Sequence, residues 1–326
     1  MKAIILYISS KQFGTGHFKR AHDYKRELSR KNIQVVTREI EDYFKAHSNN
    51  FVKKLKKFNL IILDISNKNF FQNKKIKKKL ELLFYNYSNR IGVIDGLDKD
   101  QLVNKNFFKC KFVIVPYFFL KKNISRINAK YFIGPNYLFL KKFKQKKRKN
   151  FQKNILITCG GSDLNNSSLK IVKLILKTDL SSKKLNIIIG PFYKKKNIEL
   201  LKKFCLRKKL KVNYLKFKKD IDQNLINMDI IITSSGLSKY QILRTGYPFI
   251  VFCENKFQQR LHQGFEKKKL NLTLKNLNQS KTNILKIQNF LKEIKILKKI
   301  QKVNQNILNE KKIFLFTNYL KNEIYH

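Results

Sequence analysis

The chain has 326 residues, a net charge of +51 and a hydrophobic fraction of 43% that includes 27 Phe and 14 Tyr. This aromatic content excludes a disordered chain, and the length suffices for two domains. The longest apolar run, residues 112–120, is too short to cross a bilayer, so no transmembrane helix is expected. The four cysteines are far apart and form no C-x-x-C pair, which favours inert thiols in a reducing cytoplasm.

The basic charge comes almost entirely from lysine, since only 10 of the 72 basic residues are arginine. Arginine is the usual choice for bidentate recognition of phosphates and bases, so selection for nucleic-acid binding should enrich it. Lysine is instead abundant together with Asn, Ile and Phe, as an AT-rich coding sequence would produce. We therefore expect no specific nucleic-acid partner. Attraction of an anionic ligand, or of nucleic acid, is the alternative.

Apolar runs of strand length alternate with lysine-rich stretches along the first part of the chain. This alternation is typical of βα units around a parallel sheet. Between the first two runs, Ala21, Tyr24 and Leu28 recur at spacings of three and four, which predicts a helix over 18–31. The expected strands cover residues 3–8, 34–37, 60–63, 90–94, 112–115 and 130–133.

Residues 140–150 are a charge run with little to bury, which indicates a linker. The alternation then begins again, with a helix over 167–177 and a helical region from Ser280 to the end. This region is basic and amphipathic, so a weak contact with an anionic membrane is an alternative to packing between domains. The expected strands of this part cover residues 154–158, 185–189, 211–214, 229–233 and 248–252.

These patterns predict an α/β protein with two doubly wound, Rossmann-like domains and a C-terminal helix. The first domain is expected over residues 1–142 and the lysine-rich linker over 143–152. The second domain is expected over residues 153–326, with the terminal helix. In open α/β folds, ligands bind beyond the carboxyl ends of the strands.

The first candidate site is the loop Gly14-Thr15-Gly16-His17, which follows the first strand and opens the first helix. Glycines let backbone amides approach a ligand, and a helix N-terminus favours anions. An imidazole on this loop is placed for proton transfer near neutral pH. A histidine that only bonds its own helix is an equal alternative. Arg20, one turn later, is either an anchor for a carboxylate or phosphate or ordinary helix surface.

Two further loops join a buried strand to a helix in the second half. One is Gly160-Gly161-Ser162-Asp163, and the other is Ser234-Ser235-Gly236-Leu237-Ser238. Their amides and hydroxyls suit a diphosphate, although each is also compatible with a plain helix cap. Three such loops at strand carboxyl ends favour a binding function over a plain scaffold.

These motifs resemble those of a known family, in the same order over roughly residues 1–265. The first loop with Arg20 is similar to the Gly-Ser/Thr-Gly-His-x-x-Arg signature of the UDP-sugar hydrolases of the pseudaminic-acid pathway and of related spore-coat polysaccharide proteins. The second loop is similar to their Gly-Gly-Ser/Thr-Asp turn. The third, continued to Gln241, resembles their Ser-x-Gly-x-Ser/Thr-x-Tyr-Glu helix start. Two further similarities surround Asp95 and Tyr137.

The resemblance implies a glycosyltransferase-B architecture like that of MurG, without a metal or another cofactor. It implies that the second domain binds the nucleotide and that the first faces the sugar. The implied reaction is attack of water on the anomeric carbon of a UDP-linked deoxy amino sugar, which releases UDP in pseudaminic-acid or other surface-glycan biosynthesis. The implied partner is the small nucleotide-sugar, bound by a monomer.

Within this resemblance His17 is the catalytic residue. The implied substrate-binding residues are Gly14, Thr15, Gly16, Arg20, Asp95 and Tyr137. The implied nucleotide-binding residues are Gly160, Gly161, Ser162, Gly190, Ser235, Gly236, Leu237, Ser238 and Gln241.

Several positions depart from the family pattern. Gln241 stands where a Glu is usual; it keeps a carbonyl acceptor but loses the charge, so the nucleoside stays open. Gly96 replaces a second Asp, and Leu237 and Lys239 are atypical in their loop. A glycosyltransferase on the same scaffold, with a hydroxyl acceptor in place of water, is the first alternative. A basic nucleic-acid-binding protein and a membrane-surface protein are the others.

Overall fold

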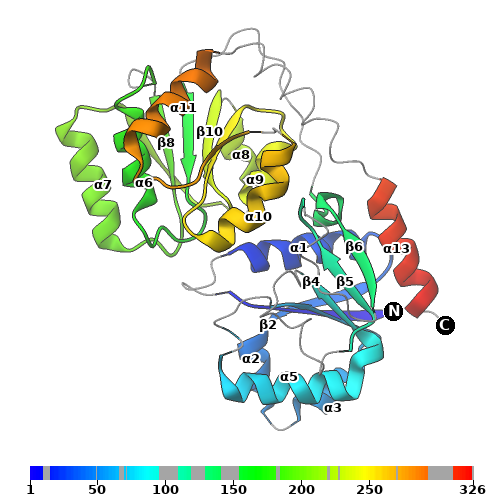
Figure 1. Ribbon diagram of the computed structural model, residues 1–326. Coiled ribbons are helices and arrows are strands. Elements are labelled where there is room, and N and C mark those ends of the chain that lie inside the picture. Colours follow the sequence, from blue (N-terminus) through cyan, green and yellow to red (C-terminus); the bar gives the residue numbers. More distant parts are fainter. Residues whose placement is uncertain are drawn as a thin grey trace. The chain divides into compact units, whose positions relative to one another are not determined.

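The structure is a computed structural model that describes residues 1–9, 15–48, 50–65, 70, 72–94, 109–118, 129–140, 154–180, 184–218, 221–226, 228–268, 271–292 and 311–324. It contains two compact units (Figure 1). Unit 1 comprises Met1–Leu140 and Asn309–His326, and unit 2 comprises Lys141–Leu308. No helix of the described ranges is long and apolar enough to cross a membrane.

Unit 1 is built on a parallel sheet of six strands in the order β2-β1-β3-β4-β5-β6. The strands are β1 (Lys2–Tyr7), β2 (Gln34–Glu39), β3 (Leu60–Asp64), β4 (Ile91–Ile94), β5 (Phe112–Val115) and β6 (Lys130–Ile133). The helices are α1 (Gly16–Ser29), α2 (Ile40–His47), α3 (Phe51–Leu55), α5 (Lys74–Tyr87) and α13 (Lys311–Ile324), with the 3-10 turns η1 (Ser88–Arg90) and η4 (Pro135–Leu138). Ala3, Ile5 and Tyr7 of β1 belong to one buried cluster with α1 and α13, because alternate residues of a strand face the same side.

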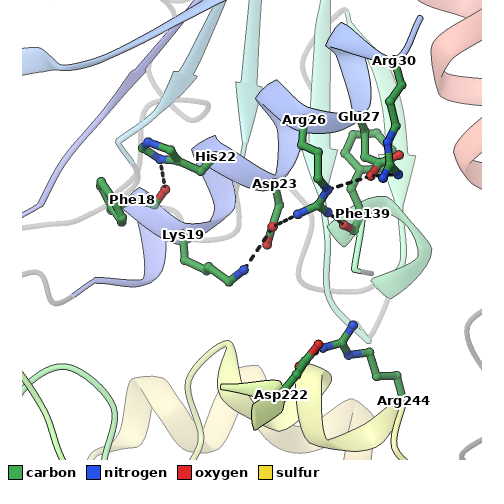
Figure 2. Close-up of polar contacts among 10 residues, drawn as sticks. All are labelled: Phe18, Lys19, His22, Asp23, Arg26, Glu27, Arg30, Phe139, Asp222 and Arg244. Carbon is green, nitrogen blue, oxygen red and sulfur yellow. Dashed lines mark hydrogen bonds and ion pairs between the residues drawn. The ribbon is translucent and has the colours of Figure 1, made fainter. Parts of the chain in front are cut away.

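Helix α1 is held in place by a buried stripe and by ion pairs along its outer side (Figure 2). The predicted residues Ala21, Tyr24 and Leu28 are fully buried in the core of unit 1. On the other side, Asp23 accepts hydrogen bonds from Lys19 at 3.2 Å and from Arg26 at 2.6 Å. Further pairs link Arg26 and Arg30 to Glu27, and Arg26 also donates to the carbonyl oxygen of Phe139 at 2.7 Å.

Helix α13 corrects the predicted domain boundaries, because it belongs to unit 1 and not to the second domain. Its residues Phe316 and Leu320 are fully buried in the core of unit 1. The Phe316 ring lies 4.9 Å from that of Phe132 in β6, and Figure 1 shows α13 (red) beside that strand. The expected linker, 143–152, lies outside the described residues.

Unit 2 is a second parallel sheet of six strands, in the order β12-β11-β10-β7-β8-β9. The strands are β7 (Asn154–Thr158), β8 (Lys184–Ile189), β9 (Val212–Lys216), β10 (Ile230–Ser234), β11 (Phe249–Phe252) and β12 (Leu272–Leu274). The helices are α6 (Ser167–Ile175), α7 (Lys195–Arg207), α8 (Asp222–Leu225), α9 (Ser238–Leu243), α10 (Lys256–Lys267) and α11 (Ser280–Lys292). Every predicted strand is present, and among the strands of the described residues only the three-residue β12 was not predicted. The predicted fold class, two doubly wound parallel sheets, is therefore confirmed.

The strand orders locate the place in each unit where a ligand is expected. In unit 1 the chain passes from β1 to β2 on one side and then returns to β3 on the other side of β1, so the order reverses between β1 and β3. In unit 2 it reverses between β7 and β10. At this point the loops that follow two adjacent strands run in opposite directions and form a crevice between them. Ligands bind in this crevice in open α/β sheets.

Candidate functional site

The candidate site of unit 1 lies where the strand order reverses, between the carboxyl ends of β1 and β3. His17 is the second residue of α1, the helix that follows β1. Asp64 is the last residue of β3, and its Cα is paired in register with that of Tyr7 at the end of β1. His17 Nδ1 lies 2.6 Å from Asp64 Oδ1. The fold thus brings together two residues that are 47 positions apart in the sequence.

The carboxylate of Asp64 is fully buried and is also held by the guanidinium of Arg20. Arg20 donates from Nε to Asp64 Oδ2 at 2.7 Å, and its Nη2 donates to Oδ1. Its Nη1 donates to the hydroxyl of Tyr117, which follows β5. Burial by itself would raise the pKa of Asp64, but the charges and hydrogen bonds of Arg20 and His17 outweigh it and hold the pKa below its usual range. Asp64 is therefore an ionised acceptor.

These contacts determine the tautomer of His17. An ionised carboxylate only accepts hydrogen bonds, so the proton of the neutral imidazole lies on Nδ1. Arg20 Nη2 is also 3.1 Å from Nδ1, but it donates to Asp64 and not to a nitrogen that already carries a proton. The basic nitrogen is then Nε2, for which no described residue is a hydrogen-bond partner. The side chain is 12% exposed, so this nitrogen can meet a small molecule as a general base.

A second histidine on the same helix, His22, has the other predicted role, that of a histidine that only bonds its own helix. His22 Nδ1 donates to the carbonyl oxygen of Phe18 at 2.9 Å (Figure 2), and its ring packs against those of Phe18 and Tyr7. It has no carboxylate partner among these contacts. His22 is thus a packing residue, whereas His17 has the arrangement of a proton-transfer group.

Several of the other residues predicted for the site of unit 1 are either outside the described residues or at the start of α1. Gly14 and Asp95 lie outside the described residues. Thr15 precedes α1, where its carbonyl oxygen accepts from the amide of Lys19 at 3.0 Å, and Gly16 is the first residue of the helix.

Arg20 and Tyr137, both predicted to contact the substrate, are buried. Arg20 is 2% exposed, and its guanidinium contacts the side chains of Asp64, Tyr117 and His17. The Tyr137 ring lies 5.5 Å from that of Phe132 in the core, and its carbonyl oxygen accepts from the hydroxyl of Tyr24.

Asp64 and Tyr117 were not predicted from the sequence. Asp64 had a detectable signal, because a carboxylate ended the buried apolar run 60–63. Tyr117 had none, since its role depends on β5 lying two strands away from β3.

In unit 2, the loop after β7 has the geometry of a turn that is closed by its own side chains. Gly160 has φ +77°, which favours glycine. The Asp163 carboxylate accepts hydrogen bonds from the amides of Ser167, at 2.5 Å, and of Ser168, at 3.1 Å. These are the first amides of α6. Asp163 therefore already accepts from the backbone N–H groups that were predicted to bind a phosphate.

A second carboxylate also lies at the start of α6. The Ser167 hydroxyl donates to Glu254 Oε1 at 2.5 Å, and burial raises the pKa of Glu254. Two carboxylates at one helix end disfavour an anion there.

Gly190, which follows β8, packs against the same turn. A Cβ at Gly190 would lie 2.5 Å from the carbonyl oxygens of both Gly160 and Gly161, so only glycine allows the two loops to meet. Its role in this structure is this close approach of backbones.

The loop after β10 is more open. We call residues 235–238 the β10 loop; it consists of Ser235, Gly236, Leu237 and Ser238. The amide of Ser235 donates to the carbonyl oxygen of Phe252, and its hydroxyl donates to that of Gln258 at 3.2 Å. In the described part of the chain, no group accepts from the next three amides. These three donors lie at the point where the strand order of unit 2 reverses, which suits an anionic ligand. Gln241, one of the implied nucleotide-binding residues, is 8% exposed on α9.

Within the described ranges, no group of three or more His, Cys, Asp or Glu side chains is arranged to hold a metal ion.

Comparisons with known proteins give few relatives by sequence and many by structure. No protein-family model matches the chain. An uncharacterized protein of Methanocaldococcus jannaschii is 26% identical over 305 residues, which cover 82% of this chain. The chain spans 59% of that relative's length.

Solved structures that are similar to this chain include MurG of Acinetobacter baumannii, with a TM-score of 0.64 and 12% identity over 99% of this chain and 100% of that one. HepE of Anabaena, in complex with UDP-glucose, has a TM-score of 0.63 and 10% identity over 99% of both chains. The UDP-GlcNAc 2-epimerase of Neisseria meningitidis, bound to UDP-GlcNAc, has a TM-score of 0.55 and 13% identity over 99% of this chain and 100% of that one. At these identities the likeness concerns the fold, and it shows that the chain has the glycosyltransferase-B fold.

Proposed function

We propose that this chain is a nucleotide-sugar hydrolase that releases UDP from a UDP-linked deoxy amino sugar, in the biosynthesis of a nonulosonic acid or another surface glycan. The observation that carries the proposal is the hydrogen bond of His17 Nδ1 to the buried Asp64. Two proteins of the same fold, HepE and the Neisseria epimerase, have been solved with a UDP-sugar. The similarity of the His17 loop to the signature of UDP-sugar hydrolases supports the choice of reaction.

The proposed step uses His17 as a general base. A water molecule attacks the anomeric carbon while its proton passes to His17 Nε2. The bond between that carbon and the diphosphate oxygen breaks, and its electron pair leaves with UDP. The imidazolium that forms is stabilised by the Asp64 carboxylate, because a buried negative charge attracts the positive charge that develops on the ring. Asp64 and Arg20 act through His17 and are positioning residues.

Unit 2 is proposed to bind the nucleotide. The free amides of the β10 loop are proposed to hold the diphosphate, where they stabilise the charge that develops on the leaving group. Gly160, Gly161 and Ser162 are proposed to line the same site from the loop after β7. Because Asp163 and Glu254 occupy the start of α6, we place the diphosphate at the β10 loop and not at that helix.

A glycosyltransferase is the second candidate, because a base that deprotonates water can also deprotonate an acceptor hydroxyl. Its support is that solved structures of this fold include a rhamnosyltransferase and a glycotransferase. The two reactions differ in whether nucleotide is released without an acceptor.

The test is to incubate the purified protein with UDP-, CMP- and GDP-sugars, without an acceptor, and to measure the released nucleotide. His17→Gln and His22→Gln form a matched pair, since both histidines are on α1 and only His17 contacts a carboxylate. We expect His17→Gln to lower kcat roughly 10²–10⁴-fold with little change in KM, because a general base contributes about this much. His22→Gln should keep kcat within about threefold of the unsubstituted protein, as expected away from the reacting atoms.

Unchanged turnover in His17→Gln would overturn the role of His17. Release that requires an added hydroxyl acceptor would favour the transferase. If no nucleotide-sugar is turned over under either condition, the enzyme proposal is wrong.

A further inference from the structure

Lys239 is a buried lysine directly beneath the β10 loop, and the proposed reaction does not use it. It is the second residue of α9 and 1% exposed. Its Nζ donates to the Ser235 hydroxyl at 3.2 Å, and that hydroxyl donates onward to the carbonyl oxygen of Gln258. The lysine thus joins the loop to α10 through one serine. Its position is also one at which the sequence departs from the family pattern.

Two aromatic rings lie close to the amine of Lys239. Its Nζ lies 5.0 Å from the ring centroid of Phe265 and 5.3 Å from that of Tyr240. Aromatic faces attract a cation, but they replace only part of the lost hydration. Lys239 therefore pays a desolvation cost whenever it is charged.

The described titratable groups around Lys239 come from three elements. Cys253 follows β11, and burial raises the pKa of its thiol to about 11, so the thiol is neutral. His262 of α10 is neutral as well, because burial and then the charge of Lys239 lower its pKa to about 2. Glu266 of α10 and Lys275, beyond β12, act on Cys253 with opposite signs. Burial accordingly lowers the pKa of Lys239 to about 7, a shift that the Cys253 thiol opposes.

We propose that Lys239 takes up a proton when a nucleoside diphosphate group occupies the β10 loop, so that it is a positioning residue for this part of the ligand. The proposal rests on the proposed function, which places the diphosphate at this loop. A diphosphate within a nucleotide-sugar carries two negative charges. Their arrival next to Ser235 favours the ammonium form of the amine that is hydrogen-bonded to it. The protonated amine then holds Ser235 and the loop in the binding geometry.

The coupling has a definite sign. A group whose pKa is raised by a ligand strengthens binding below the pKa of the free protein. Affinity therefore is highest below about pH 7, falls as the pH rises through that value, and levels off above the raised pKa. The loss amounts to about tenfold for each unit by which the ligand raises the pKa.

The test measures binding of UDP-glucose and UDP-GlcNAc to the His17→Gln protein, in which turnover is suppressed, between about pH 6 and pH 8.5, on either side of the lysine's transition. These ligands are chosen because a diphosphate esterified at both ends does not titrate in this range, whereas the terminal phosphate of UDP does. Calorimetry in two buffers of different ionisation enthalpy gives the number of protons taken up. The expected uptake near pH 8 is a substantial fraction of one proton, with affinity about tenfold lower at the upper end of the range.

Lys239→Met is the informative variant, since methionine is similar in length and removes the buried charge without leaving a cavity. It should abolish the proton uptake and flatten the pH dependence of affinity. Lys275→Met is the matched control, because Lys275 acts on the same cluster but its side chain is 61% exposed. It should keep the uptake.

Failure to bind either UDP-sugar at any pH would overturn the nucleotide site and this proposal together. Binding without proton uptake, or uptake that persists in Lys239→Met, would overturn the role of Lys239 alone. The measurement on the protein with Lys239 intact decides the matter even if the methionine variant fails to fold.

Discussion

Asp64 and Asp163 are two buried aspartates at the carboxyl edge of a parallel sheet, one in each unit. Asp64 is 0% exposed and Asp163 is 2% exposed. Asp64 contacts the side chains of His17 and Arg20, whereas Asp163 contacts the backbone amides that open α6. The same chemical group thus orients a candidate base in one unit and caps a helix in the other. Burial and position do not distinguish these roles; the partners do.

The partners of Asp163 also distinguish two loops of unit 2 that have similar sequences. Both the loop after β7 and the β10 loop join a strand to a helix through Gly and Ser. Only the first carries an aspartate at the position from which it reaches the helix amides. A carboxylate at this position occupies the donors that a phosphate would need. The first loop therefore caps its own helix, whereas the amides of the β10 loop have no such carboxylate partner in the described part of the chain.

The largest effect is expected from Asp64→Asn. The amide keeps the shape of the side chain but no longer stabilises the charged imidazole, so kcat should fall roughly 10²–10⁴-fold. Breaking the buried ion pair with Arg20 should also cost about 3–5 kcal/mol in the free energy of unfolding. Turnover of a nucleotide-sugar and the midpoint of thermal unfolding measure the two effects.

The double variant Asp64→Asn with Arg20→Met separates catalysis from stability. Because both members of the ion pair are then replaced by neutral side chains, part of the lost stability should return, while turnover should stay low. Turnover that recovers together with stability would show that Asp64 has only a structural role. Acid unfolding adds a check: because the pKa of Asp64 is lowered in the folded state, its contribution is present above about pH 4 and is lost on further acidification. The Asn variants should lack this part of the pH dependence.

An intermediate effect is expected from Asp163→Ala, and it should be on stability rather than on turnover. Loss of the helix cap costs about 0.5–2 kcal/mol, which lowers the thermal midpoint by several degrees. Turnover should stay within about threefold, since no reacting group contacts this residue. Asp163→Asn is the control and should retain most of the stability, because asparagine caps a helix about as well as aspartate. A loss of turnover as large as that of Asp64→Asn would remove the distinction between the two aspartates.

The smallest effect is expected from Arg30→Ala, which breaks the exposed end of the ion-pair series on α1. Arg30 donates to Glu27 at 2.8 Å, but its side chain is 64% exposed. Water and salt screen such a pair, so the free energy of unfolding should change by less than about 0.5 kcal/mol in a thermal or denaturant titration. A cost near that of breaking the Asp64–Arg20 pair would mean that exposure does not decide the strength of these contacts.

Features that depend on residues close together in the sequence were predicted, whereas contacts between residues far apart in the sequence were not. The strands and α1 were predicted because apolar residues recur with a period that each segment shows by itself. His17 was predicted as the base because its loop carries a local motif, and this role stays a prediction. Asp64 was not predicted, although it directly follows a predicted strand, because its contact with His17 depends on β3 lying beside β1, which only the strand order reveals. Lys239 is atypical for its loop, but its burial could not be predicted, because the residues of this loop are mostly polar.

The sequence by itself determined the alternation of strands and helices, the class of fold and the loops that can carry chemistry. These properties depend on neighbours within about one turn or one strand, where hydrophobic periodicity and turn chemistry act. Tertiary structure alone decided which side chains meet. It paired Asp64 with His17 and Arg20, turned Asp163 onto the amides of α6, and packed α13 on unit 1 although it follows unit 2 in the chain. The physical reason is that a buried charge or an apolar helix face needs a partner, and that partner is defined by the order of the strands and not by distance along the chain.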